Sequence, residues 1–79
     1  MTEQHAFNLI VAAVDKIAPG KGATITPHTN LATDVFDSLD IMNFLFALEK
    51  AVGGKLKEID EEFNDFSVGS LTKIVHRQS

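Results

Sequence analysis

The chain has 79 residues, a length that allows one small domain spanning residues 1–79. Hydrophobic residues make up 44% of it and charged residues 23%, the balance of a soluble globular protein, and no apolar run is long enough to span a membrane. Its first residues lack the basic flank and apolar core of a secretory signal, which predicts a cytoplasmic protein.

The sequence contains no cysteine, which excludes disulfides, thiolate metal sites and thiol nucleophiles. Its net charge is −4, and residues 34–65 alone hold nine acidic residues and three lysines, a net charge of −6. Because affinity for nucleic acid is built from clustered Lys and Arg, this distribution argues against a nucleic-acid partner.

Residues 3–17 are predicted to form the first helix, with Thr2 as its N-cap and Pro19-Gly20 as its end. Five apolar residues recur at the spacing of one helical face: Phe7, Ile10, Val11, Val14 and Ile17. Residues 18–37 contain both prolines and predict a long loop. We expect this loop to be ordered, because four apolar side chains can pin it to the core: Ile25, Leu31, Val35 and Phe36.

Residues 38–52 predict a second helix, which ends at Gly53-Gly54. Its core face is expected to hold Ile41, Phe44, Leu45, Leu48 and Val52. A second apolar stripe, Leu39, Met42 and Phe46, lies on another side of the same helix. Either this helix is buried on two sides, or the stripe is an exposed strip for a partner.

The last third of the chain predicts a short acidic helix or turn and a final longer helix. Asp60, Glu61 and Glu62 open the short helix, which Phe63 and Phe66 tie down. Ser67 is expected to cap the last helix, whose core residues are Val68, Leu71, Ile74 and Val75. The predicted fold is therefore all-α: a small bundle of three main helices plus one short helix, with a long ordered loop after the first helix.

Known catalytic and metal-binding patterns do not fit this sequence. Ser38 lacks the flanking glycines of a hydrolase nucleophile elbow, and the three histidines are scattered. Asp34, Asp37 and Asp40 recur at every third residue, whereas a calcium loop requires every second residue and a central glycine. We therefore expect neither an enzyme nor a metal protein.

Ser38 itself allows two interpretations. A serine at the start of a helix commonly serves as the N-cap. The start of a helix is also where a phosphodiester is well tolerated, because unpaired N–H groups and the positive end of the helix dipole face it.

Residues 37–40 (Asp-Ser-Leu-Asp), followed by an apolar helix that ends in residues 48–53 (Leu-Glu-Lys-Ala-Val-Gly), resemble the acyl carrier proteins. The resemblance extends over essentially all 79 residues, in the order of the expected segments. It implies an acyl-carrier-like bundle in which Ser38, between Asp37 and Leu39, carries a 4'-phosphopantetheine arm. It also accounts for the lack of cysteine, because the arm would supply the thiol that holds acyl or aminoacyl groups as thioesters.

The resemblance further implies a non-catalytic monomer with several enzyme partners. These are a phosphopantetheinyl transferase and the acyl-loading and acyl-transferring enzymes of fatty-acid or secondary-metabolite biosynthesis. The implied docking surface consists of Leu39, Asp40, Met42, Asn43, Phe46 and Glu49, in which acidic groups steer basic partners and apolar groups complete the contact.

Two departures from the family pattern favour a specialised carrier over a housekeeping one. The glycine usually found between the Asp-Leu pair and the Asp-Ser-Leu motif is missing, since Phe36 directly precedes Asp37. Asn43, Lys50 and Ala51 stand where typical fatty-acid carriers hold acids. The alternative function is an unmodified helical interaction module that binds a partner through the Leu39, Met42 and Phe46 face.

Overall fold

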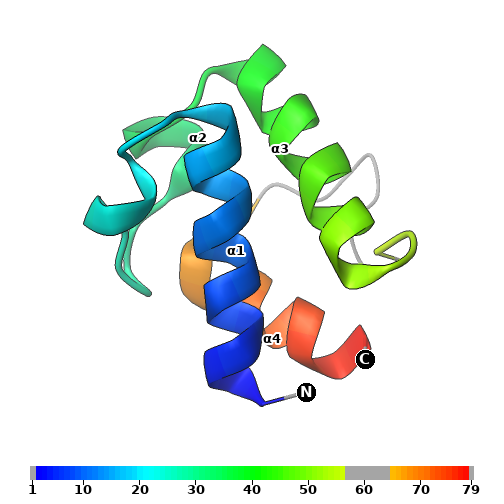
Figure 1. Cartoon of the computed structure of the whole chain (residues 1–79). Coiled ribbons are helices and arrows are strands. Elements are labelled where there is room, and N and C mark those ends of the chain that lie inside the picture. The colour runs from blue at the N-terminus through cyan, green and yellow to red at the C-terminus, as the bar shows by residue number, and fades with distance from the viewer. Residues whose placement is uncertain (1, 57–64, 79) are drawn as a thin grey trace.

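The computed structural model describes residues 2–56 and 65–78. The regular elements within these residues are helical: α1 (Glu3–Ile17), the 3-10 turn η1 (Gly22–Thr24), α2 (Leu31–Asp34), α3 (Ser38–Val52) and α4 (Val68–Gln78). Helix α1 packs against both α3 and α4, and α3 runs antiparallel to it (Figure 1). The predicted all-α bundle with three main helices is confirmed.

Helix α1 begins and ends as predicted, and its buried face contains two of the predicted residues, Ile10 and Val14, together with two alanines. The Thr2 hydroxyl accepts the His5 N–H at 3.1 Å, which makes Thr2 the N-cap. The fully buried side chains of α1 are Ala6, Ile10, Ala13 and Val14. Phe7, Val11 and Ile17, which the spacing placed on the core face, are only partly buried. Ala6 and Ala13 are buried as well, which the spacing of the larger apolar residues did not indicate.

The segment between α1 and α3, predicted as one long loop, contains the short helical elements η1 and α2. The Asn30 side chain accepts the Ala32 N–H at 3.0 Å, and the Asp34 carboxylate accepts the Asn30 N–H at 3.1 Å. These two bonds stabilise a single helical turn in a stretch that composition assigns to a loop. Within the described residues α2 is a short helix that was not predicted, and the short helix or turn predicted at residues 60–66 has most of its length outside the described residues.

The connecting segment is ordered, as predicted. Ile25, Leu31 and Phe36 are buried and Val35 is partly buried. Backbone bonds also attach the segment to the start of α4, with Leu31 N–H donating to the Phe66 carbonyl at 2.9 Å and Val68 N–H donating to the Thr29 carbonyl at 2.8 Å. The segment that leads into α3 is therefore fixed by its buried side chains and by its backbone hydrogen bonds to the start of α4.

Helix α4 has the predicted core residues, since Val68, Leu71, Ile74 and Val75 are all buried. Ser67 precedes the helix, but its hydroxyl donates to the Asp65 carboxylate at 2.9 Å instead of capping a backbone N–H. The Ser70 hydroxyl donates to the same carboxylate at 2.7 Å. These bonds, with that from Ser70 the strongest, lower the pKa of Asp65 below its ordinary value.

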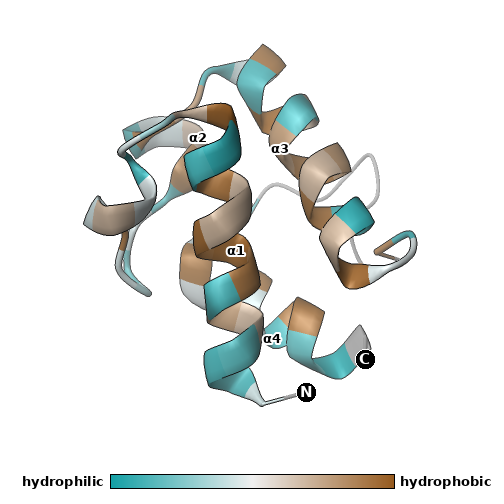
Figure 2. Cartoon of the chain, in the orientation of Figure 1, coloured by the Kyte–Doolittle hydropathy of each residue, from teal (hydrophilic) through white to brown (hydrophobic). Residues whose placement is uncertain are grey.

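Helix α3 shows the predicted two apolar faces. Ile41, Phe44 and Leu48 are buried, and Leu45 and Val52 are partly buried against the same core. Gly53, with φ of 93°, ends the helix in the left-handed conformation, where glycine carries no steric penalty. Apolar residues recur along the length of α3 in Figure 2. None of the helices in the described ranges is both long and apolar enough to cross a membrane.

Candidate functional site

The start of α3 is capped by Asp37. Its carboxylate accepts the Asp40 N–H at 2.9 Å, and its carbonyl accepts the Ile41 N–H at 3.0 Å. The interpretation in which Ser38 caps the helix is therefore wrong. A carboxylate is a good cap because its negative charge also interacts favourably with the positive end of the helix dipole.

Ser38 occupies the first position of α3 and is exposed to solvent. Because Asp37 supplies the cap, the Ser38 hydroxyl is not needed for the helix. No hydrogen bond joins that hydroxyl to any residue in the described ranges. The site therefore presents an accessible hydroxyl beside the unpaired N–H groups of a helix start, an arrangement that can accept a phosphate ester.

The segment that leads into Ser38 is anchored by Phe36. The Phe36 side chain is buried, and its N–H donates to the Leu31 carbonyl at 2.7 Å. Phe36 thus enters the core directly. Only Asp37 separates this anchor from Ser38, so the position of the hydroxyl is closely tied to the core.

The apolar stripe on α3 is exposed. The exposed fractions of Leu39, Met42 and Phe46 are 73%, 51% and 63%. The expectation of a helix buried on two sides is wrong for these three residues, which we call the α3 strip. Large apolar side chains grouped on one face beside an accessible hydroxyl are typical of a surface that contacts another molecule.

The polar residues predicted beside the strip differ in their surroundings. Asn43 is exposed and Asp40 is half-buried. Glu49 is also half-buried, and its carboxylate accepts the Leu56 N–H at 3.0 Å across the turn after α3. Glu49 therefore has a structural bond of its own, whereas Asp40 and Asn43 lie nearer to Ser38 along the helix.

A groove that the sequence did not indicate runs between α1 and α3. It consists of two open depressions of about 430 and 270 Å³ that share Lys16, Ala47 and Lys50. The end nearer Ser38 is lined by Ile17, Asp40, Asn43 and Phe46. The other end is lined by Ala12, Ala13 and Ala51. We call this feature the α1/α3 groove. Its two lysines are far apart in the sequence, so no local pattern predicts that they line one groove.

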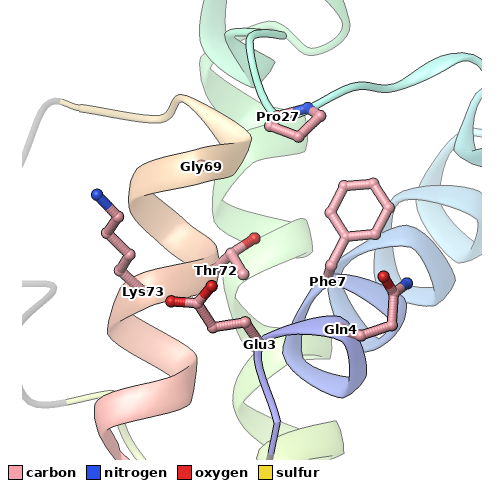
Figure 3. A pocket seen from close by; sticks show the side chains of 7 residues that line it. All are labelled: Glu3, Gln4, Phe7, Pro27, Gly69, Thr72 and Lys73. Atoms are coloured by element: carbon pink, nitrogen blue, oxygen red, sulfur yellow. The ribbon is translucent and has the colours of Figure 1, made fainter.

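A further depression of about 400 Å³ lies between α1, α4 and Pro27 (Figure 3). Phe7 and Pro27 form apolar walls, and Glu3 and Lys73 bring opposite charges to its rim. It lies near the N-terminal end of α1, whereas α3 begins beside the opposite end of α1 (Figure 1). It is therefore distant from Ser38.

No group of three or more metal-ligating side chains of His, Cys, Asp or Glu gathers within residues 2–56 and 65–78. Comparisons of the chain with protein-family models, with curated protein sequences and with solved structures find no match.

Proposed function

We propose that this chain is a carrier protein that holds acyl or aminoacyl intermediates as thioesters on a 4'-phosphopantetheine arm attached to Ser38. The observation that carries the proposal is the division of roles at the start of α3. Asp37 caps the helix, while the Ser38 hydroxyl is exposed and bonds to no described residue. A serine that served as the cap would have its hydroxyl engaged with a backbone N–H.

The residues at this position fit a phosphopantetheine group. Ser38 would hold the arm through a phosphodiester, and the first N–H groups of α3 favour the negative charge of that phosphate. The arm would supply the thiol that a chain without cysteine lacks. The protein's own contribution is delivery, because a tethered group meets a bound enzyme at high effective concentration.

The α3 strip supports the proposal because it offers a surface on which partner enzymes would dock. Leu39 directly follows Ser38, and Met42 and Phe46 continue the exposed apolar surface along the helix. A phosphopantetheinyl transferase and the acyl-loading and acyl-transferring enzymes would dock here. Asp37 and Asp40 would steer basic surfaces toward Ser38, and the strip would complete the contact. Asn43 and Lys50 reduce the negative charge of the helix, which favours a specialised set of partners.

Intact mass measures the modification directly. The purified chain is incubated with coenzyme A, Mg²⁺ and a broad-specificity phosphopantetheinyl transferase. We expect the wild type to gain one phosphopantetheine and Ser38→Ala to gain none. Ser67→Ala, which changes the serine that precedes α4, serves as the matched control and should gain the arm. An unchanged wild-type mass with several transferases would overturn the proposal.

The alternative is an unmodified helical interaction module, and the exposure of the α3 strip supports it as well. This alternative differs from the carrier function because it does not depend on Ser38 or on its modification. In that case Ser38→Ala would leave partner binding intact, and no transferase would modify the chain.

A further inference from the structure

The α1/α3 groove brings two lysines together, although it lies beside an acidic stretch of the chain and Asp40 lines its end nearer Ser38. Lys16 from α1 and Lys50 from α3 line both of its depressions. Both side chains are exposed, and neither makes an ion pair or hydrogen bond with a residue in the described part of the chain. Two cations on opposite walls of one groove form a binding arrangement for an anionic group.

The lining of the groove beside its two lysines has little side-chain bulk. Alanines from both helices line it next to Lys16 and Lys50, so an extended molecule can lie along the two helices there. Ile17 and Phe46 add apolar surface near the end closer to Ser38. This combination suits a chain of methylene groups that ends in a negative charge.

The distances along α3 match the reach of an arm on Ser38. Asp40, two positions after Ser38, lines one end of the groove, and Lys50 lies a further ten positions along the helix. At ~1.5 Å per residue, Ser38 and Lys50 are separated by about 18 Å along the axis. A phosphopantetheine arm is comparable in length with an extended peptide of about five residues, or ~17 Å.

We infer that the α1/α3 groove receives an acyl group that carries a terminal carboxylate, delivered along the groove by the arm on Ser38. This inference rests on the proposed carrier function and names the class of its cargo. The cargo is a dicarboxylic acid that is joined to the arm through one carboxyl group and keeps the other as a free carboxylate. Lys16 and Lys50 pair with the carboxylate, while Ile17 and Phe46, at the end nearer Ser38, contact the arm that leads to the acyl group. A neutral acyl group would leave both lysines without a ligand.

The test compares two cargoes of equal carbon number, succinyl and butyryl. Each is attached through an amide to an amino analogue of coenzyme A, so that the link resists hydrolysis, and a broad-specificity transferase loads it onto ¹⁵N-labelled chain. Intact mass verifies the loading. We expect the succinyl form to shift the amide resonances of Ala13, Ala47 and Lys50, and the butyryl form to leave them near their positions in the unacylated form.

Charge variants and salt test the role of the lysines. Lys16→Gln and Lys50→Gln should each lower the docked population about twofold to fivefold, the scale of one exposed ion pair. Lys21 is exposed and lies outside the groove, so Lys21→Gln is the control. It should leave the docked population unchanged. The succinyl shifts should disappear at 1 M NaCl, where the screening length is ~3 Å.

Equal shifts for both cargoes, or succinyl shifts that both lysine variants leave intact, would overturn the inference while the carrier function stands. Failure of the transferase to load either analogue or coenzyme A itself would overturn the carrier function. Circular dichroism of each variant establishes that the comparison is made on folded protein.

Discussion

The rings of Phe36 and Phe44 lie with their centroids 5.5 Å apart and their planes inclined by 37°. One ring precedes α3 and the other lies near its middle, so the contact fastens the approach to the helix onto the helix itself. Both side chains are buried, with exposed fractions of 4% and 0%. This aromatic pair holds the backbone on either side of Ser38 and couples the proposed attachment site to the core.

Removing either ring should destabilise the domain strongly. We expect Phe36→Ala and Phe44→Ala each to lower the free energy of unfolding by about 3–5 kcal/mol, because each leaves a cavity in the core. Urea denaturation followed by circular dichroism measures the loss. Phe46→Ala, which truncates an exposed ring of the same helix, is the control and should cost less than about 1 kcal/mol. Similar losses for Phe44 and Phe46 would contradict the two faces of α3.

The same Phe46→Ala change should act on partner recognition. We expect it to weaken loading by a cognate acyl-loading enzyme about tenfold, which corresponds to ~1.4 kcal/mol for one apolar contact at an interface. The measurement is kcat/KM for loading of the modified chain, alongside its melting curve. Unchanged loading would show that the α3 strip does not contact that enzyme.

Asp37 should contribute to stability through its cap. We expect Asp37→Ala to lower the free energy of unfolding by about 1 kcal/mol, because the Asp40 N–H loses its partner. Asp37→Asn retains a side-chain oxygen at the same position and should cost less. Chemical denaturation of the two variants side by side makes the comparison. If both cost the same, the carboxylate's charge and not its hydrogen bond would be the stabilising feature.

Asp65 should make stability depend on acid. Hydrogen bonds from Ser70 and Ser67 lower the pKa of its carboxyl below the ordinary value of 3.8. Because the folded pKa lies below the unfolded one, the bonds stabilise the fold above pH ~4, and this contribution is lost as pH falls through the folded pKa. Asp65→Asn should therefore destabilise the domain near neutral pH and approach the wild type as the pH falls below the folded pKa.

NMR titration of the Asp65 carboxyl carbon measures its pKa in the folded chain. Ser70→Ala should move this pKa back toward 3.8, since it removes the largest of the stabilising bonds. A wild-type pKa at or above the ordinary value would contradict the hydrogen-bonded cluster of Asp65, Ser67 and Ser70.

The three long helices follow from local sequence properties. Apolar residues recur with the helical period in α1, α3 and α4, and Thr2 and Gly53 mark two of the ends by capping preferences that depend only on neighbouring residues. The separation of Leu39, Met42 and Phe46 from the core face of α3 is also a consequence of helical geometry. These features could be predicted because they involve residues within a few positions of one another.

Other features depend on contacts between distant segments. Ala6 and Ala13 are buried on α1 together with the predicted Ile10 and Val14, while Phe7 and Val11 pack against the edge of the core, because the positions of the neighbouring helices decide which side chains are covered. The single turn of α2 formed in a loop-like composition because the Asn30 side chain caps it, the Asp34 carboxylate accepts the Asn30 N–H, and Leu31 is buried in the core. Lys16 and Lys50 line one groove only because α1 and α3 pack antiparallel. Periodicity determined which segments are helical, whereas the packing of those helices against one another decided which faces are buried and which charges meet.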